Sequence, residues 1–130
     1  MKVFYYITFI SLFLICSSFQ ITQFKSKDFL FQKWVYEDFE NNTMILKSKR
    51  NYKRDKFGIE FSENGTLERK QNANWCGTGQ IEFEIVSGTW KHISESDLEI
   101  KYKDWRGSVI DTLQIVQLTK SKLALKIISN

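Results

Sequence analysis

Residues 57–69 read FGIEFSENGTLER, and they carry the clearest structural signal in the chain. Two runs in which apolar and polar residues alternate meet at Asn64–Gly65. Alternation at period two is typical of a strand with one buried face. The Asn-Gly dipeptide tolerates the left-handed backbone of a tight hairpin turn. This stretch therefore predicts two antiparallel strands joined by a short turn.

The same alternation recurs on both sides of this hairpin, and no segment after the first 30 residues sustains a helical period. We expect about eight strands with turns every 8–12 residues, which is typical of an antiparallel sandwich or barrel. Consecutive hairpins favour a single up-and-down β-barrel, because closure removes the exposed sheet edges. The further strand-like runs are KWVYEDF (33–39), NTMILKSK (42–49), IEFEIVSGTWKHI (81–93), DLEIKYKDW (97–105), TLQIVQL (112–118) and KLALKII (122–128).

Residues 81–93 raise a question about which face points inward. Alternation places Ile81, Phe83 and Ile85 on one face, and we expect that face to lie inside the barrel. Trp90 has the opposite parity, so Gly88 is predicted to mark a bulge or bend between them.

Glu82 and Glu84 then face solvent. If the bulge reverses the parity, both carboxylates point into the barrel instead, where a pair of carboxyl groups about 5–10 Å apart could in principle support hydrolysis. This is the most plausible catalytic pair in the sequence, and it is still a poor one. We therefore expect that the protein is not an enzyme.

The first 18 residues match a secretory signal peptide. Lys2 precedes an apolar run of 14 residues from Val3 to Cys16, too short for the roughly 20 residues of a membrane-spanning helix. We expect cleavage before Phe19, a lead-in segment over 19–29 and one domain over 30–130. The alternative is a lipoprotein whose first residue is a lipidated Cys16, and only this form would be anchored to a membrane, in that case the outer membrane.

Without its signal the chain has 112 residues, enough for one domain with a hydrophobic core. Loss of Lys2 leaves 18 basic and 15 acidic residues, a balance of about +3. This is not the charge density of a dedicated nucleic-acid binder, and export also argues against that role. We expect a periplasmic or extracellular monomer without a cofactor.

Several short motifs resemble those of the small secreted lipocalin-like domain proteins of bacteria. The resemblance covers most of residues 30–128 and implies an eight-stranded antiparallel barrel whose interior or mouth holds a small apolar ligand. It rests on a tryptophan that opens the first strand, an F-x-x-x-G-T hairpin, a G-T-W strand that runs into L-x-I, and a closing I-V-x-L pattern. These stand in KWVYEDF (33–39), FSENGTL (61–67), WCGTGQ (75–80), SGTWKHISESDLEI (87–100) and IVQLTKSKLALKI (115–127).

Cys76 is the only cysteine that remains after removal of the signal. Its simplest interpretation is a small residue in a turn shaped by Gly77 and Gly79, and an intermolecular disulfide is the main alternative. Catalysis would need His92, the only imidazole in the chain, as a base. One Cys and one His do not make a metal site, so we expect no metal. His92 itself is expected to share a strand face with Trp90, as an edge or surface residue.

The run KSKRNYKRDK at 47–56 holds six cations and one acid. Its simplest interpretation is a solvated loop that improves solubility and protects an exposed edge. The alternative is a site that contacts anions or a partner protein of the cell envelope, with an aromatic ring available to stack. The residues of that site would be Lys49, Arg50, Tyr52, Lys53 and Arg54.

The aromatic residues suggest where a ligand would sit. We expect a non-enzymatic exported domain that binds a small apolar or amphipathic molecule inside the barrel or at its mouth. Two further tryptophans, Trp75 and Trp105, fall near turns and could line a mouth or a partner surface. The side chains expected nearest the ligand are Trp34, Phe83, Trp90, Leu98 and Tyr102. The alternative function is an interaction or inhibitor module that uses the basic loop 47–56 and the aromatic turns.

Overall fold

The computed structural model describes residues 28–74, 79 and 81–129 of the chain. One 3-10 turn, η1 (Asp28–Leu30), precedes all the strands of this part. The strands are β1 (Lys33–Glu40), β2 (Thr43–Ser48), β3 (Gly58–Phe61), β4 (Thr66–Asn72), β5 (Phe83–His92), β6 (Asp97–Asp104), β7 (Gly107–Leu118) and β8 (Lys122–Ser129).

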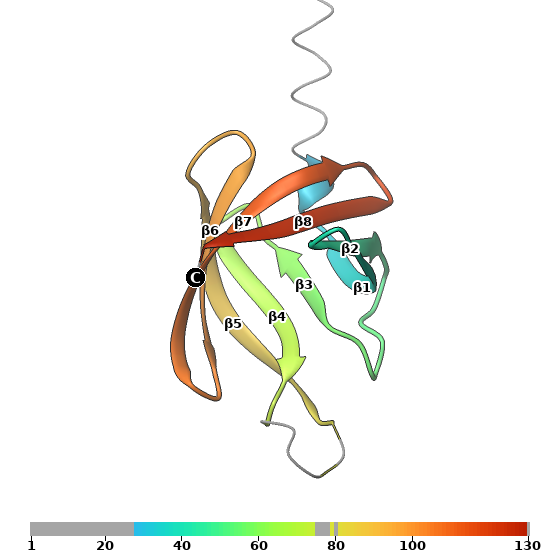
Figure 1. Cartoon of the computed structure of the whole chain (residues 1–130), viewed down its shortest axis with the longest axis vertical. Coiled ribbons are helices and arrows are strands. Elements are labelled where there is room, and N and C mark those ends of the chain that lie inside the picture. The colour runs from blue at the N-terminus through green and yellow to red at the C-terminus, as the bar shows by residue number, and fades with distance from the viewer. Residues whose placement is uncertain (1–27, 75–78, 80, 130) are drawn as a thin grey trace, which may run out of the picture.

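These strands form one closed antiparallel barrel in the order β1-β2-β8-β7-β6-β5-β4-β3 (Figure 1). The predicted all-β class, the strand number and the closed antiparallel barrel are confirmed. Strands β3 to β8 follow one another as a meander. The first hairpin differs from a pure meander, because β1 pairs with both β2 and β3, and β2 pairs with β8.

This order requires the connection 49–57 to pass across β1. Trp34 and Ile59 are buried partners inside the barrel, so Gly58, one residue along, faces outward. The ring of Tyr52 lies directly over Gly58, where a side chain would collide with it, and the Lys33 ammonium lies 4.9 Å from the centre of that ring. The connection therefore crosses the outer face of the barrel wall.

Local turn chemistry fixes the hairpins that the sequence predicted. Asn41 and Asn42 both adopt positive φ, at 49° and 61°, as a two-residue hairpin turn requires. Gly65 has a φ of 85°, and the Asn64 side chain accepts hydrogen bonds from the backbone and hydroxyl groups of Thr66. The Asn-Gly prediction is confirmed.

One end of the barrel is closed by packed side chains. Trp34 is 0 % exposed, and its indole N–H donates to the carbonyl of Leu30 at 3.0 Å. The ring of Trp90 packs against Phe31 and edge-on against Phe61. The turn η1 therefore seals this end, which we call the closed end.

The prediction that Ile81, Phe83 and Ile85 face inward is wrong for both isoleucines, while Phe83, the first residue of β5, is half-buried and lines two cavities at one end of the barrel. Strand β5 pairs with β4 from Phe83 to Thr89 without a register shift, so no bulge at Gly88 resets the parity. Glu84 therefore shares the inward face with Gly88 and Trp90, while Ile85 is 57 % exposed. The close approach of β5 to β6 explains the glycine, since a Cβ at Gly88 would collide with the Lys101 carbonyl. Ile81 is also exposed.

The predicted signal peptide, lead-in segment and lipidation site at Cys16 fall mostly on residues 1–27, outside the described residues. Within the part of the chain that the structure describes, no helix is long and apolar enough to span a lipid bilayer.

Candidate functional site: the open mouth of the barrel

The side chains that the structure describes leave cavities at the end of the barrel opposite η1. This end is formed by the β1–β2 turn, the start of β3, the ends of β4 and β6 and the start of β5 (Figure 1). Two cavities open there, of about 280 Å³ and 460 Å³, and both are lined by Phe57, Asn72 and Phe83. Arg69 and Tyr102 line the smaller one, and Tyr36 and Met44 line the larger one. We call this end the mouth.

Arg69 is the central cation of the mouth. It follows Leu67 by two residues on β4, so alternation turns it toward the barrel interior. Its guanidinium lies 4.2 Å from the centre of the Tyr102 ring and 4.7 Å from that of Phe57. Burial lowers the pKa of Arg69, and the nearby negative groups, including Asp111, oppose that shift.

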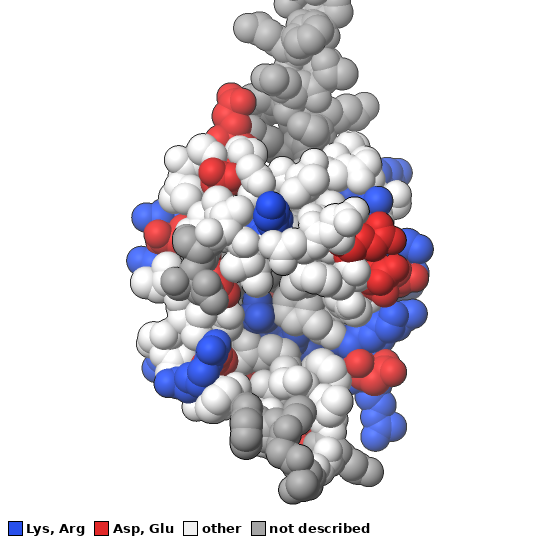
Figure 2. Space-filling view, viewed as in Figure 1, with Lys and Arg blue, Asp and Glu red and all other residues white. Residues whose placement is uncertain are grey.

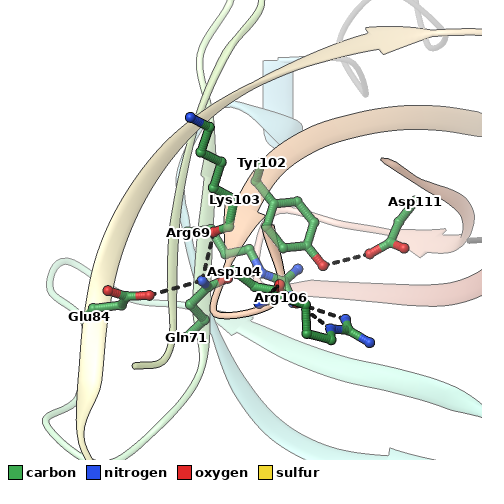
Figure 3. A network of polar contacts seen from close by, with 8 residues as sticks. All are labelled: Arg69, Gln71, Glu84, Tyr102, Lys103, Asp104, Arg106 and Asp111. Atoms are coloured by element: carbon green, nitrogen blue, oxygen red, sulfur yellow. Dashed lines mark hydrogen bonds and ion pairs between the residues drawn. The ribbon is translucent and has the colours of Figure 1, made fainter. Parts of the chain in front are cut away.

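Gln71 links Arg69 to the neighbouring strands. Its side-chain oxygen accepts a hydrogen bond from Arg69 Nε at 3.1 Å, and its amide donates to Glu84 at 3.2 Å and to the Lys103 carbonyl at 2.9 Å (Figure 3). Strands β5 and β6 pair only over four positions, ending at Thr89 and Lys101. The buried Gln71 amide thus satisfies a carbonyl beyond the last pair of that ladder.

Tyr102, which lines the smaller cavity, is hydrogen-bonded to Asp111 on the neighbouring strand β7. The Tyr102 hydroxyl donates to the Asp111 carboxylate at 2.8 Å, and both residues are buried. Burial raises the pKa of Tyr102 to about 12, aided by the Asp111 hydrogen bond and opposed by the Arg69 charge. A protonated phenol is therefore maintained here as a donor to a buried carboxylate.

The rim of the mouth carries an exposed ion pair. Arg106 donates to Asp104 through Nε at 3.0 Å and through Nη2 at 2.7 Å, and this pairing lowers the pKa of Asp104 (Figure 3). Trp105, between them in the β6–β7 turn, is 54 % exposed and lines the smaller cavity. The rim therefore offers an aromatic surface next to a pair of charges that largely satisfy each other.

The structure divides the five predicted ligand residues between two places. Tyr102 and Phe83 line the smaller cavity of the mouth. Trp34 and Leu98 are completely buried in the hydrophobic core, and Trp90 belongs to the closed end. These three pack the barrel and line neither mouth cavity.

Sequence reasoning missed the polar half of the mouth: Arg69, Gln71 and Asp111. A signal for two of them was present, because T-L-E-R-K-Q-N at 66–72 alternates Leu67, Arg69 and Gln71 on one face. Asp111 shares the inward face of β7 with Leu113, a charge at a position where the pattern favours an apolar residue.

The predicted anion or partner site on the basic loop is arranged differently from the expectation at one position. Lys49, Arg50, Lys53 and Arg54 are exposed. Tyr52 instead uses its ring to cover the barrel wall, and burial raises the pKa of its phenol, with further increases from nearby Glu68 and Glu60. The Lys70 ammonium donates to the carbonyls of Lys53 and Arg54, which holds the loop against the wall.

The other residues singled out from the sequence are not shown to be part of the mouth. His92 is exposed at the far end of β5, with its ring edge-on to Trp90 at 5.3 Å, so the predicted shared face is confirmed. Cys76 and Trp75 lie outside the described residues. Glu82 is exposed, unlike Glu84. Among the residues with described positions, no group of three His, Cys, Asp or Glu side chains could hold a metal ion.

The fold and the mouth together define a small all-β barrel with one packed end and one open, polar and aromatic end, consistent with a lipocalin-like fold. Comparisons with protein-family models, with curated proteins and with solved structures give no match to this chain.

Proposed function

We propose that the protein is an exported, non-enzymatic domain that binds a small apolar or amphipathic molecule at the mouth of its barrel. The observation that carries the proposal is the contrast between a packed interior and two open cavities that share one aromatic edge. Ligand sites are typically concave, largely apolar, and equipped with a few converging polar groups. The mouth has this composition, with Phe57 and Phe83 beside Arg69 and Gln71.

The location of the cavities restricts where a ligand can bind. Trp34, Leu46, Leu98, Ile100 and Leu123 are fully buried and fill the barrel centre. A ligand therefore occupies the mouth and contacts the core only through residues such as Tyr102. Export is part of the proposal because residues 1–18 have the length, charged start and apolar run of a signal peptide.

A fluorescence titration tests this proposal. The chain beginning at Phe19 would be titrated with N-phenyl-1-naphthylamine, a neutral probe that brightens in apolar sites. We expect saturable binding that Phe83→Ala weakens about tenfold, since Phe83 lines both cavities. Ile85→Ala is the matched control, because Ile85 lies two residues along the same strand, exposed and outside both cavities. Equal weakening by both substitutions, or no saturable binding, would contradict a site at the mouth.

The second candidate function is an interaction module of the cell envelope. It is supported by the four exposed cations Lys49, Arg50, Lys53 and Arg54 on a loop whose main chain is fixed by Lys70. Figure 2 shows acidic and basic side chains interspersed on this view of the molecule, so the charge is not gathered into a single-sign surface there. Sedimentation with vesicles containing phosphatidylglycerol, compared with a variant carrying Gln at all four positions, tests it. Absence of salt-sensitive sedimentation by the unaltered protein would exclude an anionic membrane as the partner.

A further inference from the structure

The guanidinium of Arg69 has hydrogen-bond donors that the protein does not use. Its Nε donates to Gln71, and its central carbon lies over the rings of Tyr102 and Phe57. Within residues 28–74, 79 and 81–129, no side chain or carbonyl accepts from its terminal nitrogens, and no carboxylate lies within ion-pair distance. Guanidinium groups only donate, so a bound group at this position must be an acceptor.

The charges around Arg69 restrict the kind of acceptor. Asp104 is satisfied by Arg106, Asp111 by the Tyr102 hydroxyl, and Glu84 by the Gln71 amide (Figure 3). The formal charges of these three carboxylates, the two guanidiniums and the Lys70 ammonium, which lies 5.2 Å from the centre of the Phe83 ring, sum to zero, and Asp55 and Lys56 on the larger cavity also cancel. The mouth therefore has no net positive charge to offset the cost of desolvating a bound anion. An uncharged acceptor avoids that cost and still accepts hydrogen bonds from Arg69.

The walls of the cavity restrict the rest of the ligand. Phe57, Phe83 and Trp105 line it together with Arg69, and Trp105 lies on the rim. Its volume of about 280 Å³ is at the lower limit of typical ligand pockets, roughly 300–1,000 Å³. A flat apolar body of about two fused rings has the size and the surface that such walls contact best.

We propose that the mouth selects an uncharged ligand with a flat apolar body and a carbonyl oxygen, and that this oxygen accepts hydrogen bonds from the terminal nitrogens of Arg69. This inference rests on the proposed function and adds the chemical class of the ligand. Arg69 is then the residue that determines specificity, and the aromatic residues supply contact area that is indifferent to the carbonyl group.

Three ligands with the same body test this inference on the unaltered protein. Isothermal titration would compare 2-acetylnaphthalene, 2-ethylnaphthalene and 2-naphthoate, which carry a neutral carbonyl, no acceptor and a charged carboxylate. We expect the ketone to bind about tenfold more tightly than the hydrocarbon, because a hydrogen bond to a charged donor is gained. The carboxylate is expected to bind no more tightly than the ketone. Because these comparisons need no substitution, they do not depend on whether a variant folds.

Substitution of the arginine assigns the difference to a residue. Arg69→Met retains an apolar stem beside the rings of Tyr102 and Phe57 and removes every donor, so the ketone should bind only as tightly as the hydrocarbon. Lys91→Met is the matched control, since Lys91 is an exposed cation near the closed end, paired with Glu99. Circular dichroism verifies folding. Should Arg69→Met fail to fold, Arg69→Lys is the second variant, and we expect it to retain part of the preference for the ketone.

The outcomes separate the two levels of the proposal. Equal affinity of ketone and hydrocarbon would overturn the carbonyl inference and leave a binding site at the mouth intact. Tightest binding by 2-naphthoate would also overturn it, in favour of an anion site. If the Arg69→Met variant still prefers the ketone, a donor other than Arg69 binds the carbonyl oxygen, and the proposed role of Arg69 is overturned. No binding of any of the three compounds would overturn both the inference and the proposed function.

Discussion

The closed end and the mouth of the barrel are built from the same eight strands and differ in how their polar groups are satisfied. At the closed end, the indole N–H groups of Trp34 and Trp90 donate to the backbone carbonyls of Leu30 and Ser62. At the mouth, Gln71 makes three hydrogen bonds, whereas Arg69, which lines an open cavity, uses only its Nε as a donor among the described residues. The comparison shows that one end is packed and hydrogen-bonded internally, whereas the other is open, and the proposed function assigns ligand binding to the open end.

The largest expected effect comes from removing the tryptophan of the closed end. Trp34→Ala deletes a fully buried ring and its hydrogen bond to Leu30, and should lower the free energy of unfolding by about 3–5 kcal/mol. Trp105→Ala at the mouth removes the same side chain from an exposed turn and should change it by less than about 0.5 kcal/mol. Urea denaturation measures both. Similar losses at the two positions would remove the distinction between the ends.

Gly58→Ala tests the barrel wall between the two ends. A methyl group there collides with the Tyr52 ring and displaces the crossing loop, which should cost about 1–3 kcal/mol of stability. Gly79→Ala adds the same methyl group where no atom lies within 4 Å, and it should be nearly neutral. If thermal unfolding shows Gly58→Ala to be neutral as well, the loop is not packed against the wall as described.

Tyr102→Phe tests the polar network of the mouth. Removal of the hydroxyl leaves Asp111 buried without its donor and should cost about 1 kcal/mol near neutral pH. The folded state raises the pKa of Tyr102 from 10.0 to about 12, so it binds the phenol proton more tightly than the unfolded chain does. This stabilisation is complete below pH 10 and is lost as the pH rises through about 12.

The stability difference between the unaltered protein and Tyr102→Phe should therefore shrink between about pH 10 and pH 12. Chemical denaturation at a series of pH values measures it, and the other tyrosines cancel because both proteins contain them. A difference that grows with pH would mean that the phenol ionises more readily in the folded state, contrary to its burial.

The smallest expected effect tests the orientation of β5. Ile85→Ser should change stability by less than about 0.5 kcal/mol, because Ile85 faces solvent. If the face inferred from the sequence were inside, the same substitution would remove a core residue and cost several times more. If urea denaturation shows a loss of stability above about 2 kcal/mol, Ile85 faces the interior, as the sequence pattern predicted, and Glu84 does not.

The sequence predicted the strands, the hairpins and the closed barrel, because period-two alternation and Asn-containing turns are local signals. The alternating run 97–105 does form a strand with one buried face, made by Leu98, Ile100 and Tyr102. The inward face of β5 was not predicted, because near the mouth Glu84 takes an inward position and Ile85 an outward one. There the neighbouring strand separates, and polar groups replace a core.

The order of the first three strands in the barrel could not be predicted from the local sequence pattern either. Which strand lies beside β1 depends on the path of residues 49–57, and that path is fixed by long-range contacts of Tyr52 and Lys70. The candidate site was predicted only in its aromatic part for a similar reason. Arg69 and Gln71 can be recognised as site residues only from their contacts with other strands, such as those with Tyr102 and Glu84, and these contacts are not visible in the local sequence.

The pairing of β2 with β8 also determines when the barrel can form. Met44 of β2 lies opposite Leu125 of β8. The second edge of β2, near the start of the domain, therefore stays unpaired until the last strand has been added. Strands β3 to β7 can join in chain order, whereas closure requires contacts of very long sequence separation, which slow folding. Loss of β8 would therefore expose two edges at once, one on β2 and one on β7, and turn a closed barrel into an open sheet prone to edge-to-edge association.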